Sequence, residues 1–175
     1  MNPRRHIPIL IAIVANAVLG LILIEVNHHL SVISLQALVP ASFVLYAGLC
    51  MSYLPGLIVV SVAGLMLDAV IPTPGGYFLV ALPILQIIIH RLSPKLHKEG
   101  GIDSILITQL LNLLVLLHLA FLFHKQAPVP IFSTFIQILA SQLLLLLLVP
   151  THLSIQIALS TALGIEVNDE EAKSA

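Results

Sequence analysis

Long apolar stretches, separated by short polar or proline-containing breaks, fill most of this 175-residue chain. A run of about 20 apolar residues is long enough to cross the hydrocarbon core of a bilayer as a helix. We therefore predict an all-α integral membrane protein with six transmembrane helices, at about 7–26, 31–53, 57–71, 77–91, 102–123 and 131–165. The third and fourth stretches are short, so a shallow hairpin is the alternative for that pair.

Prolines and polar residues predict where these helices end or bend. Glu25 and Asn27–His29 are expected to form a short polar turn after the first span. Pro40 lies inside the second span, where the missing N–H should kink the helix or start a new segment. The last stretch would be about 52 Å long if wholly helical, so it must kink, tilt or overhang the bilayer, and Pro150 is the expected break.

The composition agrees with a membrane protein and excludes several classes. Hydrophobic residues make up 59% of the chain and charged residues 9%, against roughly 25% charged in an ordinary soluble domain. A net charge of -1 argues against a nucleic-acid partner, which requires a basic face. The single cysteine, Cys50, excludes a disulfide framework or a cysteine metal cluster. We expect one polytopic membrane domain over residues 1–165 and an acidic, disordered tail over 166–175.

The most informative stretch is 64–76, because it holds an acid within an apolar run. Asp68 is the one charge between Leu57 and Ile71, and a charged side chain at mid-bilayer costs about 2.5–3.5 kcal/mol. Gly64 lies one turn before Asp68 on the same helical face, where it would let a neighbouring helix pack closely. We predict that Asp68 bonds to the turn from Pro72 to Gly76 or to a neighbouring span. The alternative is that it simply reaches interfacial water.

The last helix carries a single polar stripe on a leucine-rich background. Its members follow helical spacing: Ser133, Gln137, Ser141, His152, Gln156 and Ser160. Such a stripe indicates the side that faces protein or a polar partner, and we expect hydrogen bonds between helices. His118, on the fifth span, is likewise expected to bond to a neighbouring helix rather than to act as a ligand or base.

The basic residues predict the orientation. Six spans place both termini on one side, and the positive-inside rule makes that side cytoplasmic. The segments then predicted to be inside contain six basic residues, and the outer ones only Lys125: the inner set is Arg4, Arg5, Arg91, Lys95, Lys98 and Lys173.

Several of these residues together resemble the bacterial rod shape-determining MreD family. The resemblance rests on Pro40, the turn proline Pro55, the run from Gly64 to Asp68, and Gly76 eight residues after the acid. Its specific part covers residues 40–92, and the rest of the chain agrees in length, hydropathy and span count. The turn at 72–76 is richer in proline than that pattern.

The resemblance implies a non-enzymatic inner-membrane subunit of the cell-elongation machinery that makes peptidoglycan. It implies a bitopic MreC-like partner, and association with the MreB filament, a RodA-type polymerase and its transpeptidase. It also implies the six-helix arrangement of the S-components of energy-coupling-factor transporters. By that resemblance Gly64, Asp68 and Gly76 would have structural or partner-binding roles, as would Pro40. We add Pro72 from the turn that follows Asp68, and Gln137 and Ser141 from the polar stripe.

Two other functions remain to be weighed. An intramembrane enzyme is disfavoured, because Asp68 is the only acid within a span apart from Glu25 and Asp103 at span ends, and no serine has a His or Lys partner at motif spacing. We therefore expect no catalytic residue, no metal and no cofactor. The runner-up is a substrate-binding membrane subunit of a vitamin or small-molecule transporter. It would need convergent polar groups and aromatics, and aromatic residues are only 5% of the chain.

Overall fold

The computed structural model describes residues 7–71, 73, 75–95, 102–126 and 130–163, and the regular elements in these ranges are all helices. They are α1 (Ile7–Ser31), α2 (Ser42–Cys50), α3 (Tyr53–Val70), α4 (Tyr77–Leu92), the short 3-10 helix η2 (Ser93–Lys95), α5 (Ile102–Gln126) and α6 (Ile131–Ala162). In the described ranges α1, α3, α5 and α6 are long and apolar enough to cross a membrane, and α4 is a shorter apolar helix. The predicted fold class, an all-α membrane protein, is confirmed.

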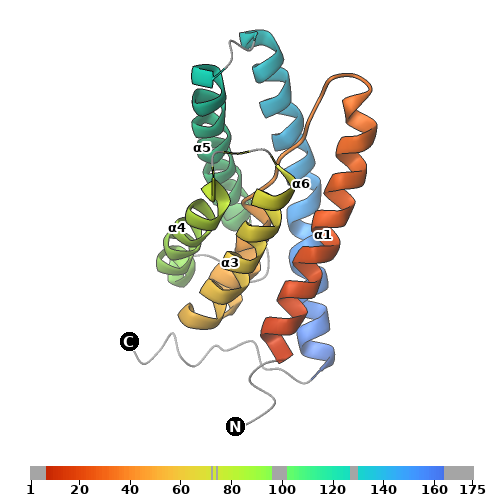
Figure 1. The fold of residues 1–175 in the computed structure, drawn as a ribbon. Coiled ribbons are helices and arrows are strands. Elements are labelled where there is room, and N and C mark those ends of the chain that lie inside the picture. Colours follow the sequence, from red (N-terminus) through yellow and green to blue (C-terminus); the bar gives the residue numbers. More distant parts are fainter. Residues whose placement is uncertain (1–6, 72, 74, 96–101, 127–129, 164–175) are drawn as a thin grey trace.

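The helices form a bundle in which α1 and α6 run side by side in opposite directions (Figure 1). Leu10 near the start of α1 and Leu159 near the end of α6 line the same groove. The beginning of α1 and the end of α6 therefore lie at the same end of the bundle. The other face of α1 packs on α3, α4 packs on both α2 and α3, and α5 packs on α6.

The second predicted span is wrong as a single helix. α1 continues to Ser31, residues 32–41 are not helical, and α2 has only nine residues. Pro40 does start a new segment, because α2 begins two residues later. The polar turn predicted at Glu25–His29 is also wrong, because these residues form the last turns of α1 and Glu25 pairs with His29 across one exposed turn at 3.3 Å.

Two prolines that were expected to interrupt helices do not. α3 begins at Tyr53, so Pro55 lies in its first turn, where its missing N–H would have had no partner within the helix. α6 is continuous through Pro150, and the hydroxyl of Thr151 donates to the carbonyls of Leu147 and Leu148 at 3.1 and 2.9 Å. A threonine hydroxyl beside a proline thus bonds carbonyl groups near the point where the missing N–H of Pro150 interrupts the backbone hydrogen bonds of the helix.

Of the residues predicted to matter, Pro72 lies outside the described ranges, as do Arg4, Arg5, Lys98, Lys173 and the tail 166–175. The α3–α4 turn ends below the tops of α1, α5 and α6 in Figure 1. α3 and α4, with 18 and 16 residues, are shorter than α5 and α6, with 25 and 32.

Candidate functional site

Asp68 sits near the end of α3 and bonds to the start of α4. Its Oδ1 accepts hydrogen bonds from the backbone N–H of Phe78 and the hydroxyl of Thr73, and its Oδ2 accepts one from the N–H of Leu79, all at 2.9 Å. The first N–H groups of a helix have no partner within the helix and carry partial positive charge. The half-buried carboxylate therefore caps α4 from outside, and the prediction that it bonds to the turn is confirmed.

Gly64 lets the two helices approach closely enough for this cap. A Cβ atom at Gly64 would lie 2.6 Å from the carbonyl oxygen of Phe78 and 2.9 Å from the Cα of Leu79. Those are backbone atoms, so no side-chain rotation can relieve the overlap. Gly64 and Asp68, one turn apart on α3, thus contact the same two residues of α4.

The rest of the turn fits the same arrangement. Gly76 precedes α4 with φ +74°, a left-handed conformation that glycine adopts without steric cost. The next residue, Tyr77, places its hydroxyl 3.2 Å from Nδ1 of His118 on α5. The predicted bond between His118 and a neighbouring helix is confirmed, and it ties the α3–α4 hairpin to α5.

A second break in helical structure lies between α1 and α2, and its backbone is bonded by side chains from three helices. Asn27 of α1 donates to the carbonyl of Ala37 at 2.9 Å and accepts from its N–H at 2.7 Å. Asn112 of α5 accepts from the N–H of Ala41 at 3.3 Å and donates to the carbonyl of Leu38 at 3.4 Å. Ser141 of α6 accepts from the N–H of Leu38 at 3.0 Å.

This second break is tolerated at membrane depth because its polar backbone groups are paired inside the protein. Ser141 also donates to the carbonyl of Gln137, one turn earlier, at 2.7 Å. Asn112 and Ser141 are fully buried, so both side chains bond to backbone groups inside the protein. Gln137 itself is half-buried and lines a separate cavity beside Gln36 and Thr134.

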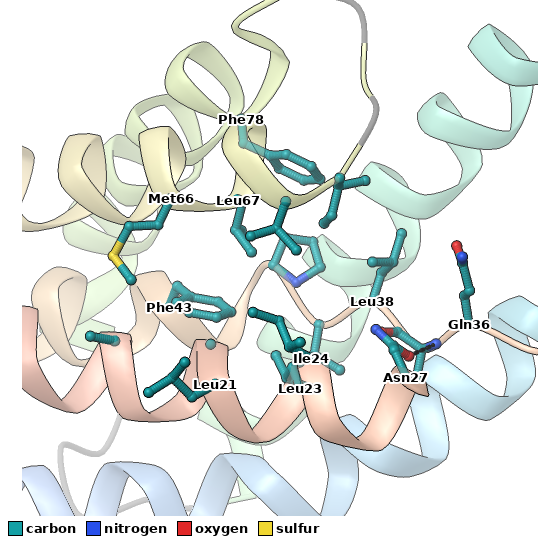
Figure 2. Close-up of a pocket in the computed structure, with 17 residues that line it drawn as sticks. Leu21, Leu23, Ile24, Asn27, Gln36, Leu38, Phe43, Met66, Leu67 and Phe78 are labelled. Carbon is teal, nitrogen blue, oxygen red and sulfur yellow. Dashed lines mark hydrogen bonds between the residues drawn. The ribbon is translucent and has the colours of Figure 1, made fainter. Parts of the chain in front are cut away.

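A cavity of about 340 Å³ lies between the two breaks (Figure 2). One wall comes from residues 36–40 of the break between α1 and α2, including Pro40, and another from Ile71 and Phe78 beside the α3–α4 turn. In Figure 2 Phe43, Met66, Leu67 and Phe78 surround the apolar part, and Asn27 and Gln36 lie at the opposite end. Asp68 bonds the backbone of Phe78, so the acid helps to position a cavity wall without lining the cavity itself.

Three further residues of the α6 stripe, His152, Gln156 and Ser160, bond to α1 or α2. Ser160 lies 2.6 Å from the hydroxyl of Tyr46. His152 Nε2 lies 3.3 Å from Oδ1 of Asn16 and 3.0 Å from Nε2 of Gln156, and Asn16 donates to the carbonyl of Phe43 at 3.1 Å. The expectation that the stripe forms hydrogen bonds between helices is confirmed for His152, Gln156 and Ser160. The side chains of Ser133 and Gln137 make no hydrogen bond to another element within the described part of the chain.

Sequence reasoning missed Asn27 and gave Asn112 no role. The signal was present, because an asparagine within an apolar span needs a hydrogen-bond partner. What the sequence could not indicate was that the partner is the backbone of a segment 10 residues away for Asn27 and 71 to 74 residues away for Asn112.

Comparisons with known proteins do not assign the chain to a family: no family model, no curated protein and no solved structure matches it. Within the described ranges, no group of three or more His, Cys, Asp or Glu side chains is arranged to hold a metal ion. The chemistry of the site therefore rests on its own geometry, which is that of intraspan polar groups bonded to the chain's own backbone.

Proposed function

We propose that the chain is a non-enzymatic inner-membrane subunit of the bacterial cell-elongation machinery, which binds an MreC-like single-span partner. The observation that carries this proposal is the set of hydrogen bonds that the Asp68 carboxylate accepts within the chain. Both carboxylate oxygens accept hydrogen bonds from the chain itself, which is the pattern of a structural acid. An acid used as a general base or metal ligand would need a free oxygen facing a reactant.

The residues that carry the resemblance to MreD fall on positions with distinct physical tasks. Gly64 allows the close approach of α4, Asp68 caps it, Gly76 takes the left-handed conformation before it, and Pro40 precedes α2. These tasks support a family pattern maintained for shape. A protein whose polar residues shape a membrane bundle suits a role in assembly, with the MreB filament, a RodA-type polymerase and its transpeptidase as further members of the complex.

The proposal includes location in the inner membrane with both termini cytoplasmic. It is supported by the basic residues Arg4, Arg5, Lys95 and Lys98 on one side of the predicted topology, and by the common end of α1 and α6. Single cysteines at positions 98 and 125, each in a Cys50→Ala background, test it. Position 125 should react with a membrane-impermeant thiol reagent added outside, and reaction at position 98 would contradict the orientation.

The partner is tested by co-purification. The tagged chain is expressed with the MreC-like protein of the same genome and extracted in mild detergent, and an unrelated single-span protein of equal length serves as the control. We expect the MreC-like protein to co-elute with the chain and the control protein to be lost. Equal retention of both, or of neither, would contradict the proposed function.

The cavity between the two breaks favours a second candidate, a substrate-binding subunit of a small-molecule transporter. Its volume of about 340 Å³ lies within the range of ligand sites, and it combines two phenylalanines with the amides of Asn27 and Gln36. Mass spectrometry of the purified chain under non-denaturing conditions distinguishes the two functions. A retained heterocycle that is lost in Phe78→Ala would favour transport.

A further inference from the structure

We propose that the groove between α1 and α6 is the docking site for the membrane-spanning helix of the partner, and that this helix carries a hydroxyl or carboxamide side chain near its middle. This inference rests on the proposed function and names the surface that the partner uses. The observation behind it is a polar atom of His152 without a partner in the described part of the chain. It lies in an outward-facing groove whose other polar lining residue, Thr151, bonds carbonyl groups of α6.

The groove has the dimensions of a helix-binding surface. It has a volume of about 480 Å³ and runs from Leu10 to Ile22 along α1, opposite residues 148–159 of α6. Twelve residues of helix rise about 18 Å, which is more than half of the hydrocarbon thickness. Leu10, Val14, Val18 and Ile22 are exposed and spaced by four residues, so they form the continuous ridge along which a second helix packs.

His152 gives the groove its polar centre. Its ring lines the groove, and its Nε2 faces Asn16 and Gln156. The other nitrogen, Nδ1, has no hydrogen bond to any described residue. His152 lines the groove, and its Nδ1 is not among the buried atoms that lack a partner, so this nitrogen is accessible from the groove. Asn16, which Nε2 faces, lies near the middle of the apolar run 7–26, and this places the nitrogen at the depth of the hydrocarbon core. A polar group without a partner there is costly, because neither water nor lipid tails can bond to it.

The occupant must therefore supply a hydrogen bond at that depth. Nδ1 is a donor in one neutral tautomer and an acceptor in the other. A serine or threonine hydroxyl, or an asparagine or glutamine amide, can serve both tautomers. An acyl chain can serve neither. A second copy of this chain would present the apolar ridge of its own α1, whose asparagine Asn16 is buried and already bonded.

Small residues leave room for the approach. Ala15 lines the groove between the ridge residues, and small side chains let membrane helices come close enough for side chains to bond across them. The partner helix is thus expected to cross beside Ala15 and to place its polar side chain against His152.

Photo-crosslinking in the intact chain locates the docking surface. A benzophenone amino acid is placed at Val14 or Ile155 in the groove, or at the exposed Leu114 of α5 as a control. The chain is co-expressed with the MreC-like protein of the same genome and irradiated in membranes. We expect an adduct with the mass of chain plus partner at positions 14 and 155 and none at 114.

Other adducts would overturn the inference. An adduct of twice the mass of the chain would assign the groove to a second copy, and lipid adducts alone would make it a lipid-facing surface. Adducts with the partner only at position 114 would place the docking site elsewhere and leave the proposed function standing. Failure of the unmodified chain to retain the partner would contradict the function itself.

Substitutions test the chemistry of the groove. Ala15→Leu adds bulk to the groove without removing a hydrogen-bonding group of the His152 cluster, and Ala69→Leu, at an exposed position on α3, is the matched control. We expect the ratio of partner to folded chain to fall about fivefold for Ala15→Leu and His152→Leu, and to stay within about twofold for Ala69→Leu and His152→Gln. An unchanged ratio in Ala15→Leu, at normal accumulation, would overturn the docking surface.

Discussion

The two breaks in helical structure are stabilised in different ways. At the α3–α4 turn a single carboxylate, Asp68, bonds groups no more than 11 residues away in sequence. At the break between α1 and α2, neutral side chains of three helices share the task, and the most distant of them, Ser141, lies 103 residues from Leu38. One break is fixed locally by a charge, and the other is fixed by the tertiary structure.

The difference predicts different behaviour on mutation. A carboxylate that accepts several bonds concentrates the stabilisation in one residue, and hydrogen bonds to charged groups are stronger than neutral ones. The asparagines and the serine each contribute one or two neutral bonds, so each loss should be smaller. Their loss should also act across the molecule, because Asn27, Asn112 and Ser141 join α1, α5 and α6 to the same segment.

The largest effect is expected for Asp68→Leu. It leaves the N–H groups of Phe78 and Leu79 and the hydroxyl of Thr73 without their acceptor, and the loss should reduce the free energy of unfolding by about 3–6 kcal/mol. Size-exclusion chromatography of a fluorescent fusion measures the folded fraction. Asp68→Asn keeps one acceptor oxygen and should retain an intermediate amount of folded protein. Normal accumulation of the leucine variant would show that the acid is merely interfacial.

Asn112→Ala should come next, with a loss of about 2–4 kcal/mol. It leaves the N–H of Ala41 and the carbonyl of Leu38 without this partner in a fully buried site. Thermal unfolding in detergent measures the change, and Asn27→Ala is the comparison, because Asn27 is only half-buried. A larger loss for Asn27→Ala than for Asn112→Ala would contradict the burial argument.

Gly64→Ala tests the close approach at the α3–α4 turn, and we expect a loss of about 1–3 kcal/mol from overpacking against backbone. Gly75→Ala is a matched control, since a Cβ atom there would meet nothing within 4 Å. Both variants are compared by melting temperature in the same detergent. Equal melting temperatures would mean that α4 can shift away from α3 at little cost.

The smallest effect is expected for Ser141→Ala, at about 1 kcal/mol, because only the N–H of Leu38 loses a partner from another element. Combined with Asn112→Ala it should cost more than the sum of the two single losses, since both side chains bond Leu38. A double-mutant cycle on the unfolding free energies checks this, and simple additivity would contradict joint support of the segment.

The two breaks also differ in how far the sequence predicts them. At Asp68 a costly charge, a glycine on its face and a following turn are neighbours in sequence, so both the contact and the close approach could be predicted. The break between α1 and α2 could not be predicted, because an apolar stretch such as 31–53 has the same hydropathy whether it is helical or extended. Pro40 indicated where a segment starts, but the side chains that permit an extended backbone come from helices whose spatial order the sequence does not encode. The break predicted at Pro150 is absent for a related reason. The hydroxyl of Thr151 bonds carbonyl groups in the preceding turn, and the helix continues through the proline.

The central claim is that the intraspan polar residues at the two breaks serve the fold and do not contact the proposed partner directly. It is tested most directly by the ratio of co-purified MreC-like protein to folded chain, measured across Asp68→Asn, Asn112→Ala and Gly64→Ala. We predict that the amount of folded chain falls in the order of the expected losses while the ratio stays constant within about twofold. A ratio that collapses in Asp68→Asn, in a variant that accumulates and melts like the unmodified chain, would contradict the account and assign the charge of Asp68 to the partner.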